Sequence, residues 1–193
     1  MALLVLGNVV VAMTVFIHQL GAGSDVSGRL YVLGALCQAL AWVLLDLGGM
    51  GDPGIAVYAG ASSMIAGIAL EAAALTLIDW PARTVAGLFG PLAGAGILVV
   101  LAVVRTPLTR AVVPQLAAVP LFVALSLLLV TSPRRNPMRI LAAAIAVVHA
   151  TVIVLPTLAV IPYFRSSENA AWAQMLVYFS STILSFMGAV AYL

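Results

Sequence analysis

Seven long apolar runs, separated by short polar connections, dominate the sequence. They cover residues 3–20, 30–47, 54–77, 84–104, 111–130, 140–163 and 170–193. About 20 apolar residues at a rise of 1.5 Å each span the hydrocarbon core of a bilayer. The connections are short and rich in Gly, Pro, Ser and Arg, which are loop residues. The pattern predicts an all-α integral membrane protein, built as a single transmembrane domain of seven helices in one bundle.

Composition excludes a soluble domain. Hydrophobic residues make up 64% of the 193 residues and charged residues only 7%, whereas soluble domains contain roughly 25% charged residues. The basic residues are eight arginines scattered between apolar runs, so the chain has no basic surface for nucleic acid. The single cysteine, Cys37, lies inside an apolar run, and no metal-ligand spacing such as CxxC or HExxH occurs. We expect no metal site and a lipid bilayer as the main surrounding.

The arginines predict an orientation. If the N-terminus is outside, the inner connections hold Arg29, Arg83, Arg134, Arg135 and Arg139, and the outer ones hold Arg105, Arg110 and Arg165. Short connections with more positive charge stay in the cytoplasm. We therefore expect the N-terminus outside and the C-terminus in the cytoplasm.

One carboxylate, Glu71, lies well inside the run from 54 to 77. At that depth a carboxylate costs a few kcal/mol, so it should face protein or trapped water rather than lipid. Gly67, Ser63 and Gly60 precede it at steps of four, four and three, which places small residues on its side of the helix. A face of this kind lets a neighbouring helix approach closely.

Other polar residues in the apolar runs complete a candidate ligand-binding pocket. Its members are Gln38, Trp42, Asp46, Glu71, Gln115, His149, Gln174 and Tyr178. Gln38, Trp42 and Asp46 share one helix face at steps of four, and Asp46, Glu71 and His149 are the ionisable members. Such a pocket can hold a small ligand, respond to protonation or relay ions. The alternative for each residue is structural: bonding between helices, a satisfied core histidine, or a solvated Asp46 at a helix end.

Residues 33–75 carry a resemblance to a known family. Trp42 lies in a helix that ends in a short Gly/Pro turn containing Gly48 and Pro53, and Gly67, Leu70 and Glu71 lie near the end of the next helix. This arrangement resembles the seven-helix N-terminal membrane sensor region of bacterial GGDEF diguanylate cyclases, although the GGDEF signature itself is absent. The resemblance implies a bacterial inner-membrane module that regulates a cytoplasmic effector C-terminal to residue 193, and it carries over no catalytic residue.

Two functions remain open on these observations. The first is a sensory domain that detects a small ligand or membrane stimulus and passes it through the last helix to a cyclase or kinase in cyclic-di-GMP-type signalling. The alternative is a small-solute or proton-coupled transporter with Glu71 and His149 on its path. No catalytic motif occurs, so we expect no enzymatic activity from these residues themselves.

Two further expectations concern cofactors and assembly. A retinal cofactor is excluded because the chain has no lysine to form a Schiff base, and we expect no other cofactor. Gly90 and Gly94 form a GxxxG pair around Pro91, which leaves a homodimer open.

Overall fold

The computed structural model describes residues 2–23, 25–49, 54–105, 107–133 and 137–163, and these residues form helices and short connections without strands. The six helices are α1 (Ala2–Ala22), α2 (Val26–Gly49), α3 (Ile55–Leu77), α4 (Ala82–Val103), α5 (Pro107–Val130) and α6 (Pro137–Tyr163). Each overlaps one predicted run. The predicted seventh span, 170–193, lies outside the described residues and stays a prediction.

All six helices are long and apolar enough to cross a membrane. Their outer faces expose large hydrophobic side chains, among them Leu6, Ile17, Leu98, Leu127 and Val148. A soluble monomer rarely exposes contiguous apolar surface on this scale, whereas acyl chains are a favourable surrounding for it. The fold is therefore that of an α-helical membrane protein.

Helix α2 begins earlier than the apolar pattern predicts, at Val26 rather than residue 30. Its first turn is fixed by Asp25, whose Oδ1 accepts a hydrogen bond from the backbone N–H of Gly28 at 2.7 Å. Gln19 of α1 donates to the same oxygen at 2.9 Å. A side-chain oxygen that satisfies a free N–H is a typical helix start, and it adds a polar turn that hydropathy does not register.

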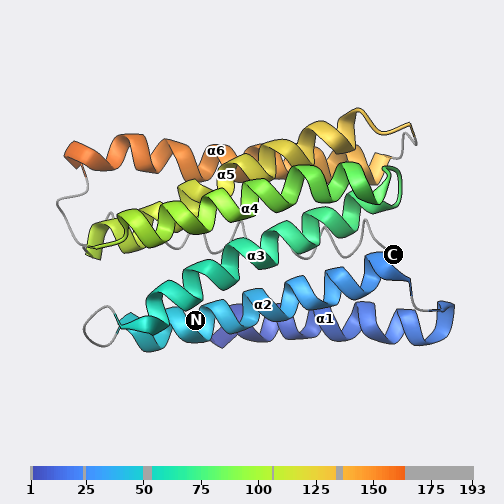
Figure 1. Cartoon of the computed structure of the whole chain (residues 1–193), viewed down its shortest axis with the longest axis horizontal. Coiled ribbons are helices and arrows are strands. Elements are labelled where there is room, and N and C mark those ends of the chain that lie inside the picture. The colour runs from blue at the N-terminus through green and yellow to red at the C-terminus, as the bar shows by residue number, and fades with distance from the viewer. Residues whose placement is uncertain (1, 24, 50–53, 106, 134–136, 164–193) are drawn as a thin grey trace.

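Helix α3 lies in the middle of the molecule. Figure 1 shows α1 and α2 along one edge, α5 and α6 along the other, and α3 crossing between the two groups. Its main contacts are with α2, α4 and α5, and the α2–α3 contact is the most extensive in the described structure. A shift of α3 therefore affects both halves of the bundle.

Small residues explain the tight α2–α3 contact. They recur every seven residues, as Ser27, Gly34, Ala41 and Gly48 on α2 and as Gly60, Gly67 and Ala74 on α3. A seven-residue spacing keeps one face of each helix turned towards its partner along the whole length. A Cβ atom added at Gly60 would lie 3.1 Å from the carbonyl oxygen of Ala41, and the Ser27 hydroxyl donates to the carbonyl of Ala74 at 2.5 Å. The two backbones are in direct contact.

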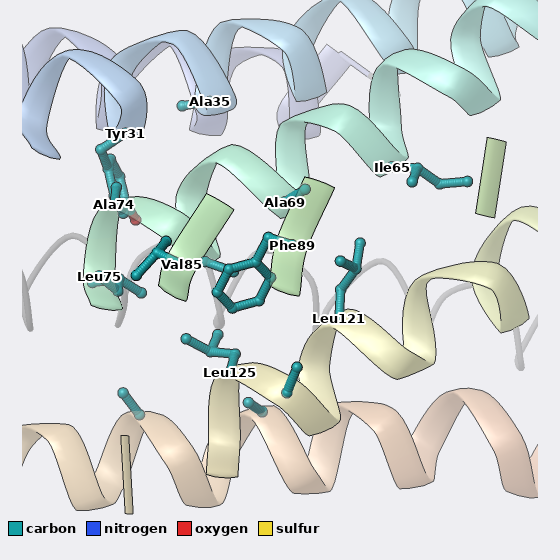
Figure 2. Close-up of a cluster of buried hydrophobic side chains, with 14 of the residues drawn as sticks. Tyr31, Ala35, Ile65, Ala69, Ala74, Leu75, Val85, Phe89, Leu121 and Leu125 are labelled. Atoms are coloured by element: carbon teal, nitrogen blue, oxygen red, sulfur yellow. The ribbon is translucent and has the colours of Figure 1, made fainter. Parts of the chain in front are cut away.

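The main apolar core draws side chains from all six described helices, and part of it lies between α3, α4 and α5. Phe89 of α4 is buried at its centre, and Figure 2 shows its ring between α3 and the side chains of Leu121 and Leu125 on α5. Val85 belongs to the same cluster. This packing joins α3 to the second half of the bundle, whereas the glycine contacts join it to the first half.

Candidate functional site around Glu71

Glu71 lies on the face of α3 that contacts α2. Its side chain is partly buried, and its Oε1 atom is fully enclosed without a hydrogen-bond partner. The carboxyl group forms a side-chain hydrogen bond with Gln38 of α2, which is itself buried. The prediction that Glu71 faces protein is confirmed.

The close approach of α2 fixes the position of Glu71. A Cβ atom at Gly34 would lie 2.8 Å from Glu71 Cγ and 2.8 Å from the carbonyl oxygen of Gly67. A Cβ atom at Gly67 would lie 2.8 Å from Gln38 Cγ. Only glycine at both positions leaves room for the two polar side chains to meet, so the glycines build the site. Ser63, on the same face of α3, donates to the carbonyl of Cys37 at 2.8 Å.

Tyr31 is a further member that the candidate list did not include. It is fully buried on α2 and lies within electrostatic range of the Glu71 carboxyl group. It precedes Gln38 by seven residues, two helical turns away on the same face. The seven-residue spacing therefore places Tyr31 on the same side of α2 as Gln38, which is the side that faces Glu71.

Trp42 and Asp46 do not meet Glu71 in the described structure. Trp42 is buried in an apolar cluster with Leu4 of α1 and Met64 of α3. Asp46 is exposed in the last turn of α2, next to the start of α3, whereas Glu71 lies near the other end of that helix. Asp46 therefore lies at an exposed helix end, as in the structural alternative given for it, and not beside Glu71.

His149 and Gln115 lie on other helices than Glu71 and Gln38. His149 is buried on α6 and stacks edge-to-face on Phe122 of α5, with ring centroids 4.6 Å apart and planes at 78°. Gln115 is half-buried in the first half of α5. The structure therefore places Glu71 and Gln38 at the α2–α3 contact and His149 at the α5–α6 contact. Gln174 and Tyr178 lie outside the described residues.

A second buried polar cluster was missed by the sequence reasoning. Asp79, just after α3, forms an ion pair with Arg139 in the first turn of α6, and both side chains are almost fully buried. Ser132, after α5, donates to Asp79 Oδ2 at 2.6 Å, and Trp80 Nε1 donates to the carbonyl of Leu128 at 3.2 Å. These contacts tie the end of α3 to α5 and α6. Because successive helices alternate in direction, the connection after α3 and the connection after α5 lie at the same end of the bundle. This shared end was the signal in the sequence that Asp79, Ser132 and Arg139 could meet.

Two grooves formed by described residues are apolar. One of about 340 Å³ runs between α4 and α5 and is lined by residues such as Val99 and Val113. The other, of about 380 Å³, lies between α5 and α6 and is lined by residues such as Val123 and Val147. Neither includes Glu71 or His149. In the part of the chain that the structure describes, no three potential metal ligands lie together.

These features define the class: a multi-pass α-helical membrane protein with a buried carboxyl group at a glycine-lined helix contact. No protein-family model, curated protein or solved structure matches the chain.

Proposed function

We propose that the chain is a sensory domain of a bacterial inner membrane. It detects a small ligand or membrane stimulus and transmits it to a cytoplasmic effector of the diguanylate cyclase or kinase type C-terminal to residue 193. The resemblance of residues 33–75 to the sensor regions of such cyclases supports the proposal. The observation that carries it is the position of Glu71, which lies partly buried at the most extensive helix contact of the described structure and is bonded to Gln38.

The contacts of α3 provide a route for the signal. Glu71 lies on the side that contacts α2, and Asp79, eight residues later, is paired with Arg139 of α6. A change in the α2–α3 contact at Glu71 therefore moves the end of α3 that holds α6. A signal of this kind is a shift between two packings of the helices, and the segment after α6 would pass it to the effector.

The proposed orientation has seven spans, the N-terminus outside and the C-terminus in the cytoplasm. Arg29, Arg83 and Arg139 lie at one end of the described bundle and Arg105 at the other, in keeping with a cytoplasmic position for the first group. A homodimer is part of the proposal, because Gly87, Gly90 and Gly94 of α4 have nothing within 4 Å of an added Cβ. An open glycine face of this kind suits a second helix.

The test uses the complete gene product in its own membrane. We expect the reading frame to continue beyond residue 193 into an effector domain, and Glu71→Gln to change the cellular cyclic di-GMP level at least fivefold. The matched control is Thr14→Val on α1, since Thr14 is exposed and its hydroxyl donates to the carbonyl of Val10 in its own helix. An unchanged cyclic di-GMP level in Glu71→Gln would contradict the sensory proposal.

Proton or solute flux separates this proposal from the transporter alternative. Purified protein in liposomes should show no more flux than empty vesicles, because the structure places Glu71 and His149 at different helix interfaces. Flux above that background that Glu71→Gln abolishes would replace the sensory proposal with transport.

A further inference from the structure

The environment of Glu71 restricts what this site can bind. Its Oε1 atom is enclosed and accepts no hydrogen bond, and the contact that its carboxyl group makes is to a neutral amide, that of Gln38. An ionised carboxylate needs hydrogen bonds or a counter-charge on both oxygens when it leaves water. A neutral carboxylic acid needs far less, so the described contacts suit the protonated form.

No basic side chain described on the neighbouring helices neutralises Glu71. On α2 the titratable groups are Tyr31, which is neutral at physiological pH, Cys37, Asp46, an acid exposed in the last turn, and Arg29, which is exposed at the helix start. Arg83 is exposed at the start of α4, and no described side chain of α5 is ionisable. On α6, Arg139 is paired with Asp79 and His149 stacks on Phe122. A carboxylate at Glu71 would lack a counter-ion among the described side chains of these helices.

Space excludes a solute on the α2 side of the carboxyl group. There even one added methyl carbon, at Gly34 or Gly67, would come within 2.8 Å of existing atoms. Two grooves formed by described residues lie along α4–α5 and α5–α6, away from this contact, and both are apolar. A ligand at the α2–α3 contact must therefore be smaller than a methyl group.

We propose that the ligand of the Glu71 site is a proton. In the packed state Glu71 is a carboxylic acid bonded to Gln38. When the acid O–H bond breaks, the proton passes to water and the electron pair stays on the carboxylate, which the α2–α3 contact does not accommodate. The helices then move apart or admit water. This inference rests on the proposed sensory function for its consequence, since it makes proton concentration the stimulus.

Infrared spectroscopy of the full chain in liposomes tests the proton site directly. At neutral pH we expect the carbonyl band of a protonated carboxylic acid, and alkaline pH should remove it. Ordinary carboxylates protonate only at acidic pH. Above that acidic range, Glu71→Gln should remove the carbonyl band at every pH. Asp46→Asn should leave the band unchanged, because Asp46 is exposed in the last turn of α2 and does not contact Glu71.

A second variant tests whether packing holds the proton. Gly34→Ala forces the Glu71 side chain to move, so the band should vanish at a pH at least one unit lower than in the wild type. A band that is absent at neutral pH, or that survives in Glu71→Gln, would overturn the proton site. A normal Glu71 band together with an effector output that ignores Glu71→Gln would instead overturn the sensory function and leave the proton site intact.

Discussion

Glu71 and Gln38 depend on each other because each would otherwise be a polar group without a partner inside the bilayer. Gln38 is buried, and its amide is bonded to a carboxyl group whose Oε1 atom has no hydrogen-bond partner. Leaving a buried polar group unsatisfied costs about 1–3 kcal/mol, more than the net contribution of the bond itself. The site is therefore sensitive to the loss of one partner.

Removing one partner should accordingly cost more than removing both. We expect Gln38→Leu to lower the free energy of unfolding by about 1–3 kcal/mol, because the carboxyl group loses its bond. In a Glu71→Leu background the same substitution should cost less, which a double-mutant cycle of denaturation in mixed micelles measures. Equal costs in both backgrounds would show that the two side chains are not coupled.

At this scale the sequence predicts which residues share a face of one helix, but not which helix lies opposite. The steps from Gly60 to Glu71 predicted a close-packed face, and the contacts of Gly60 and Gly67 with α2 confirm it. The same reasoning grouped His149 with Glu71. It could not detect that α6 turns His149 towards Phe122, because periodicity within a helix carries no information about its rotation against a neighbour.

The α2–α3 pair shows how small residues set the distance between two helices. In a bilayer the helices gain little from hiding apolar surface, so close backbone contact provides much of the attraction. Both Gly34 and Gly67 lie where a Cβ atom would come within 2.8 Å of the other helix. By contrast, Gly87 of α4 has nothing within 4 Å of an added Cβ.

Alanine substitutions should therefore separate contact glycines from exposed ones. We expect Gly34→Ala or Gly67→Ala to destabilise the protein by about 1–3 kcal/mol, the usual cost of overpacking. Gly87→Ala should be neutral or stabilising by up to about 1 kcal/mol, because alanine is the better helix former. Thermal unfolding in detergent measures all three variants, and an equal loss of stability in Gly87→Ala would contradict the role given to the α2–α3 contact.

On the scale of the whole molecule, one polar cluster connects elements far apart in sequence. Asp79 follows α3, Ser132 follows α5 and Arg139 begins α6, and the Asp79–Arg139 pair is almost fully buried. The apolar pattern predicted the helices but placed these residues in connections without a structural role. The alternating direction of the helices brings the α3–α4 and α5–α6 connections to one end of the bundle. Which side chains pair there depends on how the helices pack side by side, and the apolar pattern carries no information about that packing.

Breaking this ion pair should affect the whole bundle. We expect Asp79→Asn or Arg139→Gln alone to cost about 3–5 kcal/mol, since each leaves an uncompensated buried charge. The double variant should cost clearly less than the sum of the two, and unfolding measurements on the four proteins of the cycle give the coupling. Strict additivity would mean that the two side chains act independently.

The orientation of the bundle can be tested without altering any charge. Val26 at the start of α2 and Ile55 at the start of α3 are both exposed and lie at opposite ends of α2 and α3. In a Cys37→Ala background, which removes the single native thiol, Val26→Cys and Ile55→Cys each provide one thiol. Because the Arg29 end is expected in the cytoplasm, a membrane-impermeant maleimide added to intact cells should label Ile55→Cys at least tenfold faster than Val26→Cys. Breaking the cells should make the two rates similar. The reverse order would invert the orientation, and equal labelling in intact cells would contradict a helix pair that crosses the membrane.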